Sequence, residues 1–196
     1  METFFRDEDY EKYIELMSEW CGKLGVGIWA YCLMPNHIHL IAVPADKTGL
    51  AKAVGEAHRR YTRYINFREG WRGYLWQGRF GSFVMDEKYL AAAVRYVEMN
   101  PVRAGLVKCP WDYRWSSAAA HVNGENDALA NVKPLIDIFG DGAKFLANGN
   151  SDIELDELRM HSRTGRPLGE EGFVRRLEKR LGRILAPQKG GRPRKD

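Results

Sequence analysis

The chain has 196 residues but only three cysteines, and it contains no long apolar run. Cys21, Cys32 and Cys109 form no C-x-x-C pair and cannot all be paired with one another. This scarcity excludes a disulfide framework and a zinc knuckle, and it indicates the reducing cytoplasm. Neither a signal peptide nor an apolar segment of membrane-spanning length can be recognised. We therefore expect a cytoplasmic protein without a membrane partner.

Excess charge is also scarce, since the net charge is only +4, but the charges are unevenly distributed. Residues 52–79 carry 7 Lys and Arg against 2 Asp and Glu, and residues 159–196 carry 12 against 4. Two basic zones on a nearly neutral chain indicate a polyanion that is held at two places.

Hydrophobic periodicity predicts three helices and three strands in the first 118 residues. In chain order these are a helix over 4–23, strands over 25–33 and 38–44, a helix over 50–67, a strand over 79–85 and a helix over 87–99. Helices and strands without strict alternation favour an α+β fold, with helices on one face of an antiparallel sheet, over a doubly wound parallel sheet. The Asn-, Gly- and Asp-rich residues 119–150 predict a connector, and residues 151–187 contain two further helical patterns.

The most informative stretch contains two histidines directly after the turn that Pro35 and Asn36 predict. Successive side chains of a strand point to opposite faces, so His37 and His39 must project from the same face. Two neutral imidazoles on one rigid strand form half of a divalent-metal site. The pair could instead be hydrogen-bonded in a polar sheet face, and the pattern alone leaves both interpretations open.

The helix predicted over 87–99 supplies candidates for a nucleophile and a third ligand. Tyr96 lies away from the apolar stripe of this helix, and Asn100 follows it by four residues on the same side. An amide oxygen with two imidazoles would give an open site for Mg²⁺ or Mn²⁺. Alternatively, Tyr96 is a surface tyrosine, and Asn100 satisfies backbone groups before Pro101.

Several motifs in this order resemble the REP-associated tyrosine transposases, which belong to the single-tyrosine HUH nuclease superfamily. These motifs are MPNHIHL (34–40), LWQGRF (75–80), YVEMNPVRAGLV (96–107) and WSS (115–117). Two basic segments, RTGRPLG (163–169) and GRPRK (191–195), resemble the C-terminal region of that family. The resemblance covers nearly the whole chain. It implies a catalytic HUH domain over 1–118, a connector over 119–150, a helical DNA-binding extension over 151–187 and a flexible basic tail over 188–196.

The resemblance also implies a ferredoxin-like sheet and the cleavage of single-stranded DNA. His37 and His39 would bind Mg²⁺ or Mn²⁺ with help from Asn100, and Tyr96 would attack single-stranded DNA. The cleaved strand would remain on Tyr96 through its 5′ phosphate, and reversal would transfer it without ATP because the link keeps the phosphodiester energy. The partner would be the hairpin of a repetitive extragenic palindrome, and the protein a nucleoid-associated monomer, with a homodimer as the alternative.

Hairpin recognition is expected to use both basic zones, although a run of charge is also typical of a solvated helix face. The aromatic side chains of Trp71, Tyr74 and Trp76 could stack on bases or pack into the core. The tail around Arg192 and Arg194 could enter a minor groove. The expected DNA-binding residues are Lys52, Arg59, Arg63, Arg79, Arg103, Arg163, Arg166, Arg175, Arg176, Lys179, Arg180, Arg183, Arg192 and Arg194.

One departure from the family concerns the beginning of the sequence. Family members usually begin with a strand and a Gly-Asn-Arg-rich segment, and this sequence begins at the edge of the first helix. Because that strand lies beside the metal-bearing strand, we expect three strands and a vacant sheet position. The alternative function is therefore an impaired or domesticated copy that only binds hairpins. An unrelated phosphoesterase is disfavoured because position 41 is Ile and the other histidines are isolated. Of these, His58 is expected at the surface or in a groove, and His121 and His161 are expected to be solvated.

Overall fold

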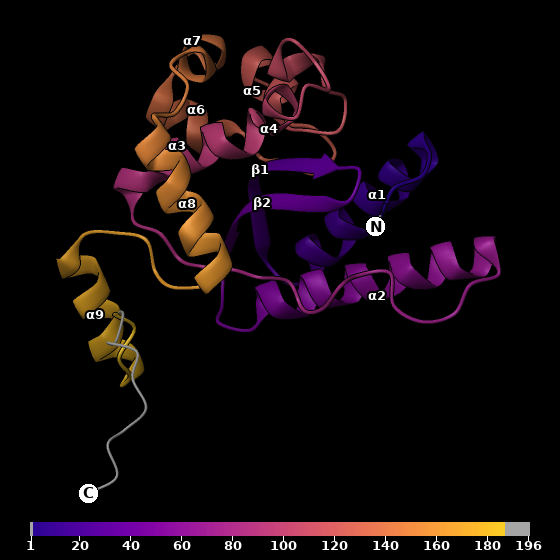
Figure 1. Cartoon of the computed structure of the whole chain (residues 1–196), viewed down its shortest axis with the longest axis horizontal. Coiled ribbons are helices and arrows are strands. Elements are labelled where there is room, and N and C mark those ends of the chain that lie inside the picture. Colours follow the sequence, from indigo (N-terminus) through magenta and orange to yellow (C-terminus); the bar gives the residue numbers. More distant parts are fainter. Residues whose placement is uncertain (1, 187–196) are drawn as a thin grey trace, which may run out of the picture.

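The computed structural model describes residues 2–186 and confirms the α+β class (Figure 1). Arg192 and Arg194 lie outside the described residues. The elements are α1 (Asp7–Lys23), β1 (Val26–Met34), β2 (His37–Pro44), α2 (Gly49–Glu69), α3 (Glu87–Glu98), α4 (Asn100–Arg103), the 3-10 turn η1 (Pro110–Asp112), α5 (Ala118–Asn123), α6 (Lys133–Phe139), α7 (Gly142–Ala147), α8 (Asp152–Thr164) and α9 (Glu171–Leu181). Within residues 2–186, every helix is too short or too polar to cross a membrane.

The start of α1 is fixed to the end of α2 by a buried carboxylate. Three acidic residues open α1, where the positive end of the helix dipole favours them. One of them, Asp9, is fully buried and pairs with Arg68 near the end of α2. Asp9 also accepts a hydrogen bond of 2.9 Å from the backbone N–H of Phe5. Such partners are what a buried carboxylate requires, so these two helix ends are held in one place.

A β-bulge at Trp29 decides which side chains of β1 face which way. The antiparallel register passes from Ile28 opposite Ala42 to Ala30 opposite Ile41, which leaves one extra residue in β1. An extra residue reverses the alternation of faces in the bulged strand. After the bulge, Cys32 lies opposite His39, and both strands keep one common face toward α3.

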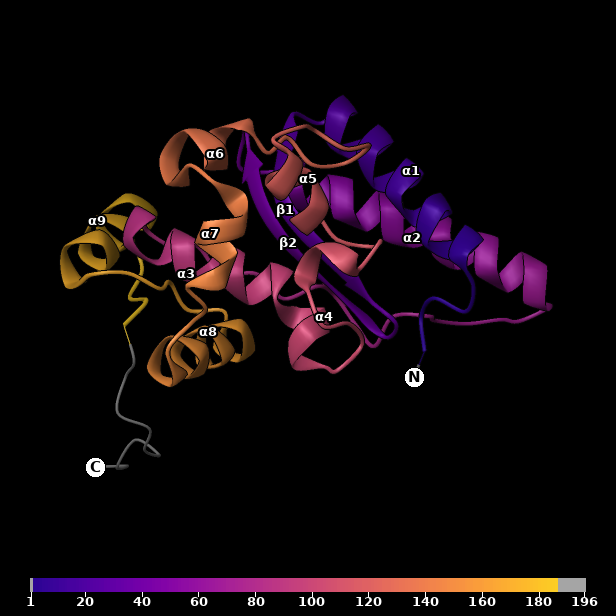
Figure 2. The same ribbon diagram turned by 90° about the horizontal axis from the view of Figure 1, so that it is seen from above.

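Helices cover both faces of the β1–β2 hairpin, whereas one covered face was expected (Figure 2). The face that carries Ile28, Tyr31 and Leu33 packs against α1 and α2. The other face, with Ala30 and Cys32, packs against α3 and the helices that follow it. The physical reason is that β1 is apolar at consecutive positions from Ala30 to Met34, so that both of its faces carry apolar side chains.

The prediction of a third strand over residues 79–85 is wrong. These residues form no sheet strand, and Met85 makes only an isolated bridge to Leu168 in the segment between α8 and α9. The N–H of Leu168 donates to the carbonyl of Val84 over 2.9 Å, and the N–H of Asp86 donates to Leu168 over 3.0 Å. Leu168, which belongs to a distant segment, therefore forms hydrogen bonds at the end of the segment that was expected to join the sheet.

The second edge of β1, where a vacant position was expected, is partly filled by residues 115–117. Cys32 and Ser116 form an antiparallel bridge. The N–H of Leu33 donates to Trp115 over 2.8 Å, and the N–H of Ser117 donates to Tyr31 over 3.0 Å. The WSS motif thus acts as a short substitute for a neighbouring strand.

The segment expected to be a plain connector contains α5, α6 and α7, which carry buried side chains. Leu135 and Leu146 join the same core cluster as α3, as does Leu158 of α8. By contrast, α9 has no buried residue and stands apart from the other helices (Figure 1). The C-terminal part therefore has a packed portion, which includes α8, and a solvent-exposed helix.

Candidate functional site

The imidazoles of His37 and His39 converge at the beginning of β2. Their Nε2 atoms lie 3.1 Å apart, with ring centroids separated by 4.8 Å. Both rings therefore project from the same face, as their spacing predicts. The Nδ1 atom of His37 lies 2.6 Å from the side-chain oxygen of Asn36. Because a ring nitrogen that donates fixes the tautomer, this contact favours a free lone pair on Nε2 of His37.

Both histidines favour the neutral form, which is the form that binds metals. Burial lowers the pKa of His37. Burial, followed by the neighbouring His37 and then Arg103, lowers the pKa of His39 to about 4. Both lone pairs are therefore available for an electrophile at neutral pH.

Tyr96 on α3 lies directly over this pair. Its ring contacts the ring of His39 edge-on, with centroids 5.5 Å apart. The guanidinium of Arg103 lies 4.5 Å from the centre of the Tyr96 ring and donates a hydrogen bond to the Tyr96 carbonyl. The phenol ring thus contacts both an imidazole and a cation. Asn100 opens α4 four residues after Tyr96, and its amide makes no hydrogen bond to either imidazole within residues 2–186.

A buried polar cluster fixes α3 to the rest of the fold. Glu98, two residues after Tyr96, is fully buried, and its Oε1 accepts a hydrogen bond from Ser117 and contacts Nδ1 of His121. The Ser117 hydroxyl in turn accepts the N–H of Tyr31 in β1 over 2.8 Å. This cluster therefore connects α3, α5 and β1. It ties the helix that carries Tyr96 to the hairpin that carries the histidines.

The donor set fits a small divalent ion. Two cis ligands about 2.1 Å from an octahedral ion are about 3 Å apart, which matches the 3.1 Å between the two Nε2 atoms. No group of three His, Cys, Asp or Glu in residues 2–186 could hold a metal. A third protein ligand would therefore be an amide such as Asn100, with the remaining positions open to water and phosphate oxygens.

The model of the family described as Transposase IS200 like matches residues 2–100, which include the histidine pair, Tyr96 and Asn100. The chain belongs to this family. A Haemophilus influenzae protein assigned as a REP-associated tyrosine transposase is 30% identical over 107 residues. That match covers 49% of this chain and 61% of the relative, so this chain spans less than two thirds of the relative's length.

A solved structure of a REP-associated tyrosine transposase bound to a REP hairpin has the same fold. The TM-score is 0.53, with 21% identity over 64% of this chain and 76% of that chain. At this identity the structure supports the fold, and the match to the IS200-like family confirms the family-level resemblance of the sequence motifs.

The basic residues expected to flank the histidine pair and Tyr96 do not all lie beside them. Lys52, Arg59 and Arg63 are on α2, which packs against the face of the hairpin opposite to Tyr96. Arg79 is exposed in the segment between α2 and α3. Only Arg103 directly contacts a predicted site residue. The remaining described residues of the set are exposed on or near α8 and α9, and they are Arg163, Arg166, Arg175, Arg176, Lys179, Arg180 and Arg183.

The positions of three residues were missed from the sequence. His121 was expected to be solvated but is buried against Glu98. His58, expected at the surface or in a groove, is half-buried on the face of the hairpin opposite to Tyr96, where it stacks on Trp76 at 3.9 Å and bonds to Tyr13 over 2.9 Å. Burial lowers the pKa of Arg103, Tyr96 opposes this shift, and the charge of Arg159 on α8 lowers the pKa further. Arg159 therefore brings positive charge toward the site, and it lies in the basic zone of residues 159–196 without being among the expected DNA-binding residues.

Proposed function

We propose that the protein is a metal-dependent single-stranded DNA endonuclease and strand transferase that acts beside hairpins of the REP type. The observation that carries this proposal is the position of the Tyr96 ring over His39, whose Nε2 converges with that of His37. Membership of the IS200-like family supports the reaction class. The hairpin as partner is taken from the relatives that are described with it.

In the proposed reaction, the Tyr96 hydroxyl oxygen attacks the phosphorus of a phosphodiester. The bond from phosphorus to the tyrosine oxygen forms as the bond to the 3′ oxygen breaks. The phenol gives up a proton to solvent, and the departing 3′ oxygen takes one up to become a 3′-OH. Attack of another 3′-OH on the phosphotyrosine reverses these steps and joins two strands.

The protein groups around Tyr96 would orient it for this attack. Arg103 holds the ring from one side and lies close to where negative charge develops on the phenol and phosphate. His37, His39 and Asn100 would hold Mg²⁺ or Mn²⁺, which would polarise the scissile phosphate. A tyrosine phenol is mostly protonated at neutral pH, so orientation and charge neutralisation are the main contributions required.

A second candidate function is hairpin binding without cleavage. The sheet of residues 2–186 has only two strands, and a reduced sheet is a feature of an impaired copy. Both functions would be exercised on chromosomal DNA in the cytoplasm. They differ in one product, the covalent protein–DNA adduct.

The test is incubation of the protein with a labelled hairpin that carries a single-stranded extension, in the presence of Mn²⁺ or Mg²⁺. We expect a labelled band that migrates with the protein on a denaturing gel and is absent with EDTA. An unmodified protein under all these conditions would refute the proposed reaction and favour the second function.

His39→Ala is expected to reduce adduct formation to background while hairpin affinity changes little. The substitution removes one of the two converging Nε2 atoms, whereas contacts to phosphates supply most of the affinity for DNA. Adduct yield on denaturing gels and affinity by fluorescence anisotropy measure the two effects separately. Full adduct yield in His39→Ala would show that this imidazole is not a required ligand.

Removal of α9 and the tail is expected to flatten the salt dependence of hairpin binding. A deletion of 159–196 would cut through α8 and remove the buried Leu168, so a deletion of 171–196 is the appropriate one. Every phosphate that the shortened protein no longer neutralises reduces the slope of log K against log salt by about 0.7 to 0.9. We expect the slope to fall by several times the amount that one phosphate contributes, as measured by titration at a series of salt concentrations. An unchanged slope would exclude α9 and the tail from the DNA site.

A further inference from the structure

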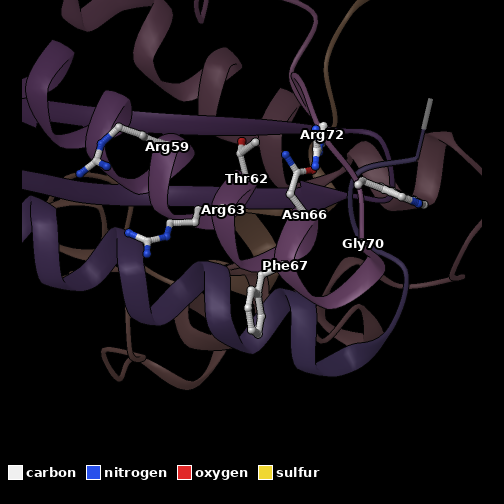
Figure 3. A pocket seen from close by; sticks show the side chains of 8 residues that line it. Arg59, Thr62, Arg63, Asn66, Phe67, Gly70 and Arg72 are labelled. Atoms are coloured by element: carbon white, nitrogen blue, oxygen red, sulfur yellow. The ribbon is translucent and has the colours of Figure 1, made fainter.

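A pocket of about 530 Å³ lies at the C-terminal end of α2, on the outer side of this helix (Figure 3). Gly70 ends α2 in the left-handed conformation, at φ +68°, and turns the chain back on itself. The backbone N–H of Trp71 donates to the Asn66 carbonyl, and the Asn66 amide donates to Gly73, both over 2.9 Å. The pocket is therefore formed by the last turns of α2 and the segment that returns beside them.

The walls of this α2-end pocket combine cations with exposed aromatic rings. Arg59, Arg63 and Arg72 line it, and no acidic residue does. Within residues 2–186, Arg63 and Arg72 have no acidic partner within 4.0 Å, whereas Arg59 pairs with Glu56. The pocket therefore carries uncompensated positive charge on a surface that is open to solvent.

Aromatic side chains at the pocket are exposed to an unusual degree. Phe67 is 91% exposed and Trp71 is 49% exposed, and Tyr74, three residues further, is 95% exposed. The Trp71 ring is held edge-on against Phe5, with centroids 5.5 Å apart. Clustered exposed apolar groups of this kind mark binding surfaces. A fixed aromatic ring beside unpaired arginines is the arrangement that binds single-stranded nucleic acid, by stacking on bases and attracting phosphates.

The α2-end pocket and the histidine pair lie at the same end of the hairpin, on opposite faces. The backbone N–H groups of Thr3 and Phe4 donate to the carbonyl of Pro35 in the β1–β2 turn, over 2.8 and 3.1 Å. The next residue, Phe5, contacts Trp71. In Figure 1 the end of α2, the start of α1 and this turn lie at one end of the molecule. A strand that passes over the turn from His37 would therefore approach the pocket.

We propose that the α2-end pocket binds the single-stranded DNA that flanks the hairpin, by stacking bases on Phe67 and Trp71 and pairing phosphates with Arg63 and Arg72. This inference rests on the proposed function for the identity of the DNA. The charge of the pocket selects a polyanion, and its exposed rings select unpaired bases over a duplex.

The test compares the affinities of a bare hairpin and a hairpin with an oligothymidylate extension, by fluorescence anisotropy in EDTA. The double variant Phe67→Ala/Trp71→Ala, which truncates the two aromatic residues that line the pocket, is expected to weaken binding of the extended hairpin by about 5- to 100-fold per stacked base. Affinity for the bare hairpin should stay the same. Ile138→Ala, which truncates an exposed apolar residue on α6, is the matched control and should change neither affinity.

A second readout locates the DNA. An extension that contains 5-iododeoxyuridine is expected to photo-crosslink to Phe67 or Trp71, as mapped by mass spectrometry. Equal affinities in the double variant, or crosslinks only outside residues 59–74, would overturn the proposal. Concentration-dependent dimerisation that the double variant abolishes, with unchanged DNA affinity, would assign the surface to a second copy of the chain. Because EDTA prevents cleavage, failure of adduct formation would refute the proposed reaction without affecting this result.

Discussion

Tyr96→Phe is expected to abolish the covalent protein–DNA adduct and to leave the fold and the hairpin affinity unchanged. The substitution removes only the hydroxyl oxygen, which is the atom that attacks phosphorus in the proposed reaction. The ring contacts to His39 and Arg103 need only the aromatic ring and the backbone carbonyl, so they are retained. The adduct is measured on denaturing gels with a labelled hairpin and Mn²⁺, and the fold by circular dichroism.

The matched control for this variant is Tyr89→Phe, near the start of the same helix α3, which should form the adduct at the rate of the unchanged protein. Tyr61 is a poor candidate for an alternative nucleophile, because it is fully buried and its hydroxyl donates to the carbonyl of Thr3 over 2.9 Å. An adduct that persists in Tyr96→Phe and disappears in Tyr89→Phe would assign the nucleophile to Tyr89.

Glu98→Ala is expected to lower the free energy of unfolding by about 1–3 kcal/mol, the usual cost of leaving a buried polar group without its hydrogen-bond partner. The substitution leaves the hydroxyl of Ser117 and Nδ1 of His121 buried without their common acceptor. It also breaks the connection between α3 and β1 that runs through Ser117 to Tyr31. Urea unfolding measures the effect as a lower midpoint with an unchanged m-value.

The same cluster is expected to influence the position of Tyr96. Glu98→Gln keeps a side-chain oxygen at this position, so we expect it to lose less stability than Glu98→Ala. In conditions where Glu98→Ala remains folded, its adduct should form more slowly while its hairpin affinity stays the same, because α3 is less firmly held to the hairpin. If Glu98→Ala were as stable as the unchanged protein, the cluster would not support α3.

Much of the local structure could be predicted because short-range patterns determine it. The helices predicted over 4–23, 50–67 and 87–99 match α1, α2 and α3 to within three residues at each end, and the strands of the hairpin match β1 and β2 similarly. Period-two alternation was enough to place His37 and His39 on one face, since β2 contains no bulge. The motif resemblance then indicated the family.

Long-range pairing could not be predicted in the same way. Residues 79–85 were expected to be a strand of the sheet, but the carbonyl of Val84 instead accepts from Leu168, far along the chain. The surface position expected for His121 was wrong because Glu98 needs a buried partner, and an isolated histidine carries no sign of such a partner. Local composition likewise concealed the helices of residues 119–150, whose few apolar side chains suffice once α3 covers them.

The sequence by itself determined the helices, the hairpin and the shared face of the two imidazoles, because each depends on residues only a few positions apart. Only the tertiary structure determined which elements pack against one another. The bulge at Trp29 selects the face that β1 shares with His39, and packing of α3 on that face brings Tyr96 to the pair. The return of the chain after Gly70 likewise creates a second basic and aromatic surface. Such contacts join distant parts of the chain, and the free energy that selects them comes from burial of the whole core.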